Sequence, residues 1–179
     1  MSILTGIPSQ TQVPLEGFVG QILARLGDMV TRVERCDARR GMARIEPDRV
    51  LDAARAVMTI PGWRFITATG LDVRDGIDVL YHWAFEPAGV IVTLKALAQR
   101  PEITLDSLGA ILPAANWIER EMHDLLGANF RGHPDMRRLI LDDSWPEGVY
   151  PLRKSFDTAT DKPPLPPTPP APESAEGQP

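Results

Sequence analysis

The sequence has little that would support chemistry of its own. A single cysteine, Cys36, excludes a disulfide within the chain and a cysteine-rich cradle for zinc or an iron–sulfur cluster. The glycine-rich loops that bind nucleotide phosphates are absent, and so is the turn that presents a nucleophilic serine. No nearly continuous apolar run reaches about 20 residues, the length of a membrane-spanning helix, and Met1 to Gly6 lack the features of a secretory signal. We therefore expect a soluble chain with no direct membrane span.

The overall composition is that of a globular protein with a core of ordinary size. The 179 residues are 43% hydrophobic and 24% charged, which fits one domain with tails. The net charge of −5 and the sequence pI of about 5.2 argue against a nucleic-acid partner, because nucleic-acid binding needs a basic surface.

The spacing of apolar residues predicts an α+β domain over residues 15–127, in which helices pack on a mixed β-sheet. The predicted helices cover 15–26, 47–58, a short piece at 106–112 and the main helix at 113–126. The predicted strands cover 29–35, 42–45, 63–70, 77–85 and 90–98. We expect a turn at Arg74-Asp75-Gly76, where Gly76 would tolerate a positive φ, and a hairpin connection at 86–89.

The two ends of the chain differ in composition from this domain. Residues 1–14 are polar and interrupted by proline, so we expect a flexible arm. Residues 128–157 are predicted to form an extended docking segment, which we call the strap. Residues 158–179 are so rich in proline that we expect a disordered tail. Such a tail could bind an aromatic-lined groove, which leaves open an adaptor function through the tail alone.

The helix predicted at 113–126 is densely charged. Its apolar stripe should face the core and consists of Ala114, Ala115, Ile118, Met122, Leu125 and Leu126. Arg120, His123 and Asp124 lie on the opposite side, and the spacing of Arg120 and Asp124 suits an ion pair. Glu119 and Glu121 fall on the borders of the stripe. We expect arginines from adjoining structure to pair with these two carboxylates, and the candidates are Arg137, Arg138 and Arg153.

Two catalytic interpretations of this helix can be weighed against that structural one. Glu119 and Glu121 are close together on a helix, but their directions diverge, since neighbouring positions differ by about 100°, and they cannot act on one atom as an acid–base pair. Glu119 and His123 are four residues apart and His133 could join them around a metal, but the ligand spacing is poor. His133 is expected to be a hydrogen-bonded histidine in a turn. We predict no catalytic, cofactor or metal residue in the chain, although a small independent enzyme using Glu119, His123 or His133 stays an alternative.

The charged helix and the strap together resemble the signature of one family. The matching residues are Glu119-Arg120-Glu121, Asp124-Leu125-Leu126-Gly127, Phe130, Gly132-His133-Pro134, Arg137-Arg138, Trp145 and Pro151-Leu152-Arg153-Lys154. They resemble the thirty-kilodalton subunit family of respiratory complex I and its hydrogenase relatives. Residues 75–82 are similar to the central strand of that family.

The resemblance implies an accessory role rather than an active site. Members of the family carry no redox cofactor and pack against a large, hydrogenase-like catalytic subunit. The iron–sulfur clusters, and a nickel–iron centre in the hydrogenase branch, would then lie in partner subunits. The chain would be part of a hetero-oligomer that includes neighbouring iron–sulfur subunits, held on the cytoplasmic face of the inner membrane by its partners.

The residues expected at the partner interface all belong to the helix and the strap. They are Glu119, Arg120, Glu121, Asp124, Phe130, His133, Arg137, Arg138, Trp145, Arg153 and Lys154. The segments 145–151 and 79–83 look more like the energy-converting [NiFe] hydrogenase and formate hydrogenlyase branch than like the thirty-kilodalton subunit of NADH:quinone oxidoreductase. The latter remains the alternative.

Overall fold

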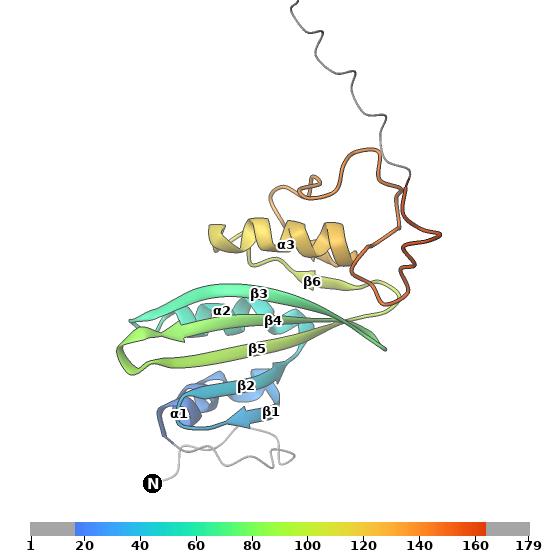
Figure 1. Ribbon diagram of the computed structural model, residues 1–179. Helices are drawn as coiled ribbons and strands as arrows, with labels where there is room; N and C mark the ends of the chain where they lie inside the picture. The colour runs from blue at the N-terminus through green and yellow to red at the C-terminus, as the bar shows by residue number, and fades with distance from the viewer. Residues whose placement is uncertain (1–16, 164–179) are drawn as a thin grey trace, which may run out of the picture.

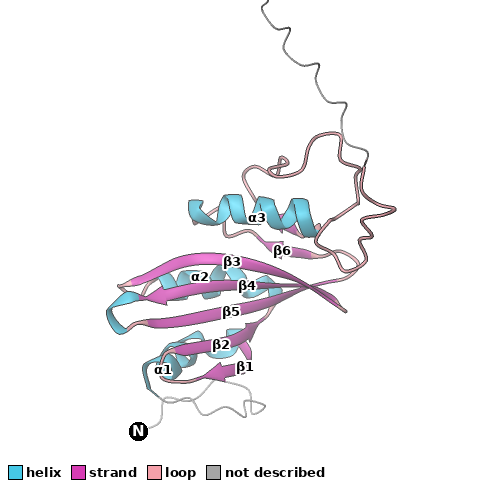
Figure 2. Cartoon of the chain, viewed as in Figure 1, coloured by secondary structure: helices cyan, strands magenta, loops and turns pink. Residues whose placement is uncertain are grey.

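The computed structural model describes residues 17–163, so the arm predicted at 1–14 and most of the predicted proline-rich tail lie outside the described residues. The helices are α1 (Gly17–Leu26), α2 (Val50–Met58) and α3 (Pro113–Leu126), with 3₁₀ turns η1 (Gly27–Met29), η2 (Pro47–Arg49) and η3 (Glu86–Ala88). The strands are β1 (Val30–Cys36), β2 (Arg40–Ile45), β3 (Trp63–Val73), β4 (Gly76–Phe85), β5 (Val90–Gln99), β6 (Thr104–Asp106) and β7 (Asn129–Arg131). Figure 1 traces their order from α1 to the strap, and Figure 2 shows that the strap is largely without helix or strand.

Five of the strands form one mixed sheet in the order β1-β2-β5-β4-β3. The pairs β1–β2, β5–β4 and β4–β3 are antiparallel, whereas β2 and β5 are parallel. Parallel neighbours need a crossover connection, and here α2 and the β3–β4 hairpin supply it. The predicted α+β class with helices on a mixed sheet is therefore confirmed.

All three helices pack on the same face of the sheet. Side chains of α1 surround Gly41 of β2, and side chains of α3 surround Gly70 of β3. Both glycines belong to the alternate set of residues that includes Val79 and Val92, which point into the core. The other face carries polar residues, among them Asp78, which accepts a hydrogen bond from Arg44 (3.0 Å) and lies 3.1 Å from the Lys95 ammonium.

The structure corrects two local expectations. Residues 106–112 do not form a short helix; they are the end of β6 and a turn, and β6 pairs in parallel with β7, which the sequence did not indicate. Gly76 follows the Arg74-Asp75 turn as expected but does not have a positive φ. A glycine is required there for another reason: a Cβ at this position would overlap the carbonyl oxygen of Ala98 on β5.

Gly76→Ala should therefore destabilise the protein by about 1–3 kcal/mol, the usual cost of forcing extra atoms into a packed site. Gly148→Ala is a useful control, because Gly148 has φ +77° but no atom within 4 Å of the place that a Cβ would occupy. Gly148→Ala should destabilise the protein by only about 1 kcal/mol, the cost of holding an alanine in the left-handed backbone conformation. Urea unfolding of both variants measures the difference, and equal losses would contradict the steric explanation for Gly76.

Candidate functional site

The site predicted from the sequence is built on α3 and the strap. Pro113 occupies the first turn of α3, where a missing N–H is harmless. The helix ends at Leu126 and is capped by Gly127, which has φ +70° and donates its N–H to the His123 carbonyl at 2.9 Å. A Cβ at Gly127 would also overlap Tyr150 and Arg153 of the strap. The strap therefore packs directly on the C-terminal end of α3.

Glu119 is fully buried, and its partners are not arginines. Its carboxylate accepts hydrogen bonds from the Ser107 hydroxyl (2.5 Å), the Leu108 N–H (2.7 Å) and the Gly109 N–H (3.2 Å). The prediction that Glu119 pairs with a strap arginine was wrong, because the turn after β6 supplies three donors at close range. Burial raises the pKa of Glu119 above its usual value, and these hydrogen bonds only partly offset that effect.

His133 lies beside Glu119 with its side chain completely buried. Its Nε2 is 3.1 Å from the Asn116 carbonyl oxygen, and its Nδ1 accepts the N–H of Asp135 at 3.0 Å. A nitrogen that accepts an N–H is not protonated, so this geometry holds the neutral Nε2–H tautomer. The 3.8 Å approach of Nε2 to Glu119 is then not an ion pair. The expectation of a hydrogen-bonded turn histidine is confirmed.

Arg120 binds the backbone of the strap rather than Asp124. Its guanidinium donates from Nε to the Arg137 carbonyl (2.9 Å) and from Nη2 to the Arg138 carbonyl (2.8 Å). It also lies 3.8 Å from the Asp135 carboxylate, and only 11% of the Arg120 side chain is exposed. The predicted ion pair between Arg120 and Asp124 was therefore wrong, because both side chains reach out to the strap instead.

Asp124 provides the second attachment of the strap. One of its carboxylate oxygens accepts three consecutive backbone N–H groups, from Leu139 (2.7 Å), Ile140 (2.8 Å) and Leu141 (3.2 Å). Burial acts to raise the pKa of Asp124, but these three hydrogen bonds outweigh it and leave the pKa below its usual value. Since the ionised form is the better acceptor, the strap is held most strongly when Asp124 is charged.

A third attachment covers the C-terminal end of α3. The Leu152 N–H donates to the Leu125 carbonyl at 3.0 Å, and Arg153 Nε donates to the Leu126 carbonyl at 2.7 Å. These carbonyls have no partner within the helix, and a cation is favourable at this end of the helix dipole. The Arg153 guanidinium also lies over the Tyr150 ring, 4.2 Å from its centre.

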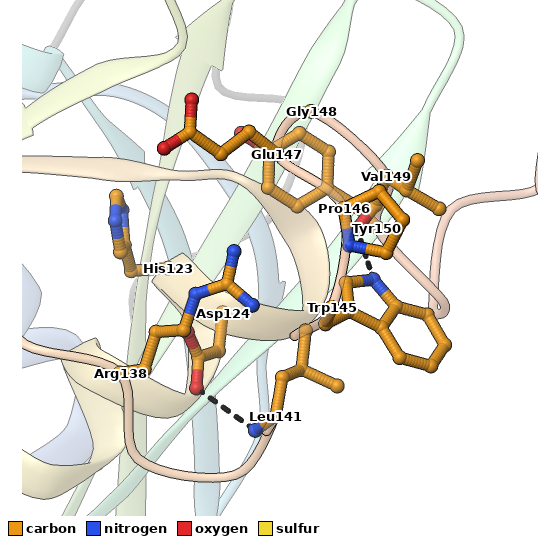
Figure 3. Close-up of a pocket in the computed structure, with 10 residues that line it drawn as sticks. All are labelled: His123, Asp124, Arg138, Leu141, Trp145, Pro146, Glu147, Gly148, Val149 and Tyr150. Carbon is orange, nitrogen blue, oxygen red and sulfur yellow. Dashed lines mark hydrogen bonds between the residues drawn. The ribbon is translucent and has the colours of Figure 1, made fainter. Parts of the chain in front are cut away.

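Between these attachments the strap and α3 line an open pocket of about 330 Å³. Figure 3 shows His123, Arg138 and Glu147 around it, with the rings of Trp145 and Tyr150 on one side. Trp145 donates its indole N–H to the Val149 carbonyl at 2.8 Å and stacks on Phe156. Trp145 is thus an anchor of the strap itself.

The remaining predicted interface residues divide into buried and exposed groups. Phe130 is only 4% exposed and belongs to the core. Glu121 and Lys154 are exposed, and the Arg137 side chain is 84% exposed while paired with Asp135 at 2.8 Å. Sequence reasoning missed three large exposed apolar side chains on α3 and the strap: Trp117 (67%), Ile140 (56%) and Leu152 (58%). Trp117 could have been noticed, because it lies off the apolar stripe of its helix.

The described residues contain no group of three or more His, Cys, Asp or Glu side chains placed to hold a metal ion. Within residues 17–163, no helix is both long and apolar enough to cross a membrane. Glu119 and Glu121 do not converge on a common point, since one is buried against Ser107 and the other is exposed. The geometry defines a folded scaffold with a surface of mixed charged and apolar residues on α3 and the strap.

Comparison with known proteins identifies the class of this scaffold. Residues 43–162 match the family described as the 30 kDa subunit of respiratory-chain NADH dehydrogenase. This match covers α2, strands β3, β4 and β5 and the α3–strap region, whereas α1, β1 and the first half of β2 precede it. The chain belongs to that family.

Individual relatives carry related names. The C subunit of NADH-quinone oxidoreductase from Mesorhizobium japonicum is 44% identical over 79 residues, which are 44% of this chain and 38% of that protein. Its namesake from Moorella thermoacetica is 32% identical over 120 residues, which are 65% of this chain and 80% of that protein. The chain thus spans well under half the length of some curated relatives that it matches. A chain of the membrane-bound sulfane sulfur reductase, an archaeal respiratory membrane complex, has the same fold, with a TM-score of 0.67 and 27% identity over 78% of this chain and 83% of that chain.

Asp124 allows a direct test of strap attachment. Asp124→Asn keeps an oxygen that can accept the three N–H groups but removes the charge, whereas Asp124→Leu removes the acceptor. We expect the Leu variant to lose about 1–3 kcal/mol of stability and to be cut rapidly by protease near residues 139–141. The Asn variant should be affected clearly less. Equal protease resistance of the wild type and the Leu variant would contradict this role.

Glu119 should leave a signature in the pH dependence of stability. Its pKa is raised in the folded protein, so the folded state binds the proton more tightly than the unfolded chain does. The Glu119 contribution is therefore fully present below the ordinary value of 4.5 and declines as pH rises through the folded pKa. Glu119→Gln cannot titrate and should remove this decline. Denaturant unfolding from pH 4 to 8 measures it, and an unchanged pH profile in the Gln variant would contradict the assignment.

Proposed function

We propose that the chain is a non-catalytic accessory subunit that docks on the large catalytic subunit of a membrane-associated redox complex. The complex is of the energy-converting [NiFe] hydrogenase type, in which hydrogen evolution or oxidation is coupled to ion translocation. Iron–sulfur clusters and the nickel–iron centre belong to partner subunits. The partners hold the chain on the cytoplasmic face of the inner membrane.

The observation that supports docking most strongly is the combination of a fixed strap with exposed apolar side chains. Ile140 and Leu152 are each more than half exposed, yet both lie in segments held by hydrogen bonds to α3. A segment that only needed to cover the helix would not require large apolar residues facing outward. Exposed apolar groups rimmed by charge are typical of protein interfaces. Arg137 and Lys154 provide that charged rim.

The buried charged residues act in this proposal as supports of the interface rather than as contacts. Glu119 has no exposed surface, and Arg120 and Asp124 are occupied by the strap backbone. Arg120 and Asp124 fix the path of residues 137–141 and so preorganise the outward-facing side chains. A rigid surface binds more tightly than a mobile one, because less conformational freedom is lost on binding.

The second candidate is the corresponding subunit of an NADH:quinone oxidoreductase, and the names of most curated relatives favour it. The segment 145–151 favours the hydrogenase type. The large subunit encoded beside this chain distinguishes the two. Cys-x-x-Cys nickel ligands in that subunit, with hydrogen turnover by the purified complex, would support the hydrogenase type; quinone reduction without those ligands would support the other.

Arg137→Glu tests the docking surface itself. Arg137 is highly exposed and its backbone, not its side chain, anchors the strap, so the variant should fold normally. We expect recovery of the large subunit in a pull-down from co-expressing cells to fall about tenfold, as for reversal of a charge within an interface.

Arg55→Glu is a matched control, because Arg55 on α2 is also exposed and also pairs with a nearby aspartate. It lies outside the α3–strap surface and should leave recovery unchanged. Undiminished assembly with Arg137→Glu, or an equal loss with both variants, would count against the proposed surface.

A further inference from the structure

The edge of the sheet at β3 is open. β3 is the last strand in the order β1-β2-β5-β4-β3 and pairs only with β4. Alternate residues of an edge strand direct their backbone N–H and C=O groups away from the sheet. Among the described residues, no backbone group outside β4 pairs with β3 between residues 66 and 71. This edge is therefore available as a template for another strand.

The open edge has few of the features that usually prevent pairing, apart from a β-bulge between Phe65 and Thr67. β3 is 11 residues long, and its central stretch Ile66-Thr67-Ala68-Thr69-Gly70-Leu71 carries no charge and no proline. Natural proteins commonly protect edge strands with lysine, proline or short length. Ile66 and Leu71 are 39% and 47% exposed, so apolar side chains line this edge as well.

A groove runs between this edge and α3. It has a volume of about 280 Å³ and is lined by Thr67, Ala68, Thr69, Gly70, Ile118, Glu121, Met122, Leu125, Leu126 and Leu152. One wall is thus the edge of β3, and the other is the mainly apolar flank of α3, with strap residue Leu152 among the lining residues. Figure 1 shows α3 lying beside β3 along this edge.

Glu121 is the one charged residue among the described residues that line this groove. Glu121 is exposed, and no cation of the described residues forms an ion pair with it. Trp117, which is 67% exposed, lies one helical turn before Glu121 on the same side of α3. The groove therefore offers backbone groups, apolar surface and one carboxylate to whatever occupies it.

We propose that the groove between β3 and α3 receives an extended strand of the large partner subunit. The strand pairs through its backbone with residues 66–71 and places alternate apolar side chains against Ile118 and Leu125. A lysine or arginine on it meets Glu121. Strand addition at a sheet edge is a recurring mode of peptide recognition. This inference rests on the proposed function, since it specifies which kind of segment of the large subunit binds to this surface.

The charge of the groove argues against a second copy of the chain as the occupant. Pairing of β3 with β3 of another copy would bring its own α3, and with it a second Glu121, toward the same groove. Like charges in such proximity disfavour association. A partner strand with a basic residue meets no such repulsion.

Hydrogen exchange tests this proposal with the full chain, alone and in the complex purified after co-expression with the adjacent large-subunit gene. We expect the amides of residues 66–71 to exchange at least about tenfold more slowly in the complex, because outward N–H groups gain partners. The opposite edge strand, β1, serves as the internal control and should be unchanged. A photoreactive amino acid at Thr69 should crosslink to one short segment of the large subunit.

Two charge variants complete the experiment. Glu121→Lys should weaken binding of the large subunit by up to about fivefold and Glu121→Gln by less, the usual range for a solvent-exposed ion pair.

The outcomes separate this proposal from the proposed function. If the complex forms but residues 66–71 exchange as fast as in the free chain, the strand addition is wrong and the docking function stands. If no complex with the large subunit forms, both are wrong. Concentration-dependent protection of residues 66–71 in the chain alone would assign the edge to a second copy and overturn the proposal.

Discussion

Hydrogen bonds between side chains of α3 and the backbone of the strap are the interaction on which the rest of the structure depends. Arg120 donates to two successive carbonyl groups, and one oxygen of Asp124 accepts three successive N–H groups. Such peptide groups would otherwise be paired within a helix or sheet or with water. Charged partners make strong hydrogen bonds, so a segment with almost no secondary structure still has a defined path.

Each side of α3 makes a different set of contacts. The inner side packs Ala115, Met122 and Leu126 into the core, and Glu119 continues that side by binding the turn after β6. One flank holds the strap through Arg120 and Asp124. The other flank, with Ile118, Glu121 and Leu125, lines the groove along the open edge of β3. A single helix thereby positions both surfaces that we propose for the partner subunit.

Much of the fold could be predicted from the sequence, because the helices and long strands are local patterns. Apolar periodicity indicated α1, α2, α3 and all five strands of the main sheet. The three-residue strands β6 and β7 could not be found in this way, because they pair only with each other across more than 20 intervening residues. The helix expected at 106–112 failed for a related reason: Glu119 draws the N–H groups of Leu108 and Gly109 out of any helical pattern.

The candidate site was predicted in its location but not in its contacts. The spacing of Arg120 and Asp124 does suit an ion pair, yet their actual partners lie 15 to 18 residues further along the chain. Helical spacing put Glu119 on the border of the apolar stripe. Its full burial could not be foreseen, because burying a carboxylate is costly without compensating donors, and the donors come from a turn that the sequence did not reveal. Helical periodicity alone cannot show whether a charged side chain faces a partner, water or its own backbone.

The most direct test of this account is the amide exchange of the strap in the isolated full-length chain. If α3 fixes the strap before any partner binds, the amides of Leu139, Ile140, Leu141 and Leu152 should exchange at least about tenfold more slowly than in an unstructured peptide. Exchange at the unstructured rate, with protection gained only in the complex, would contradict the claim that the chain itself preorganises its docking surface.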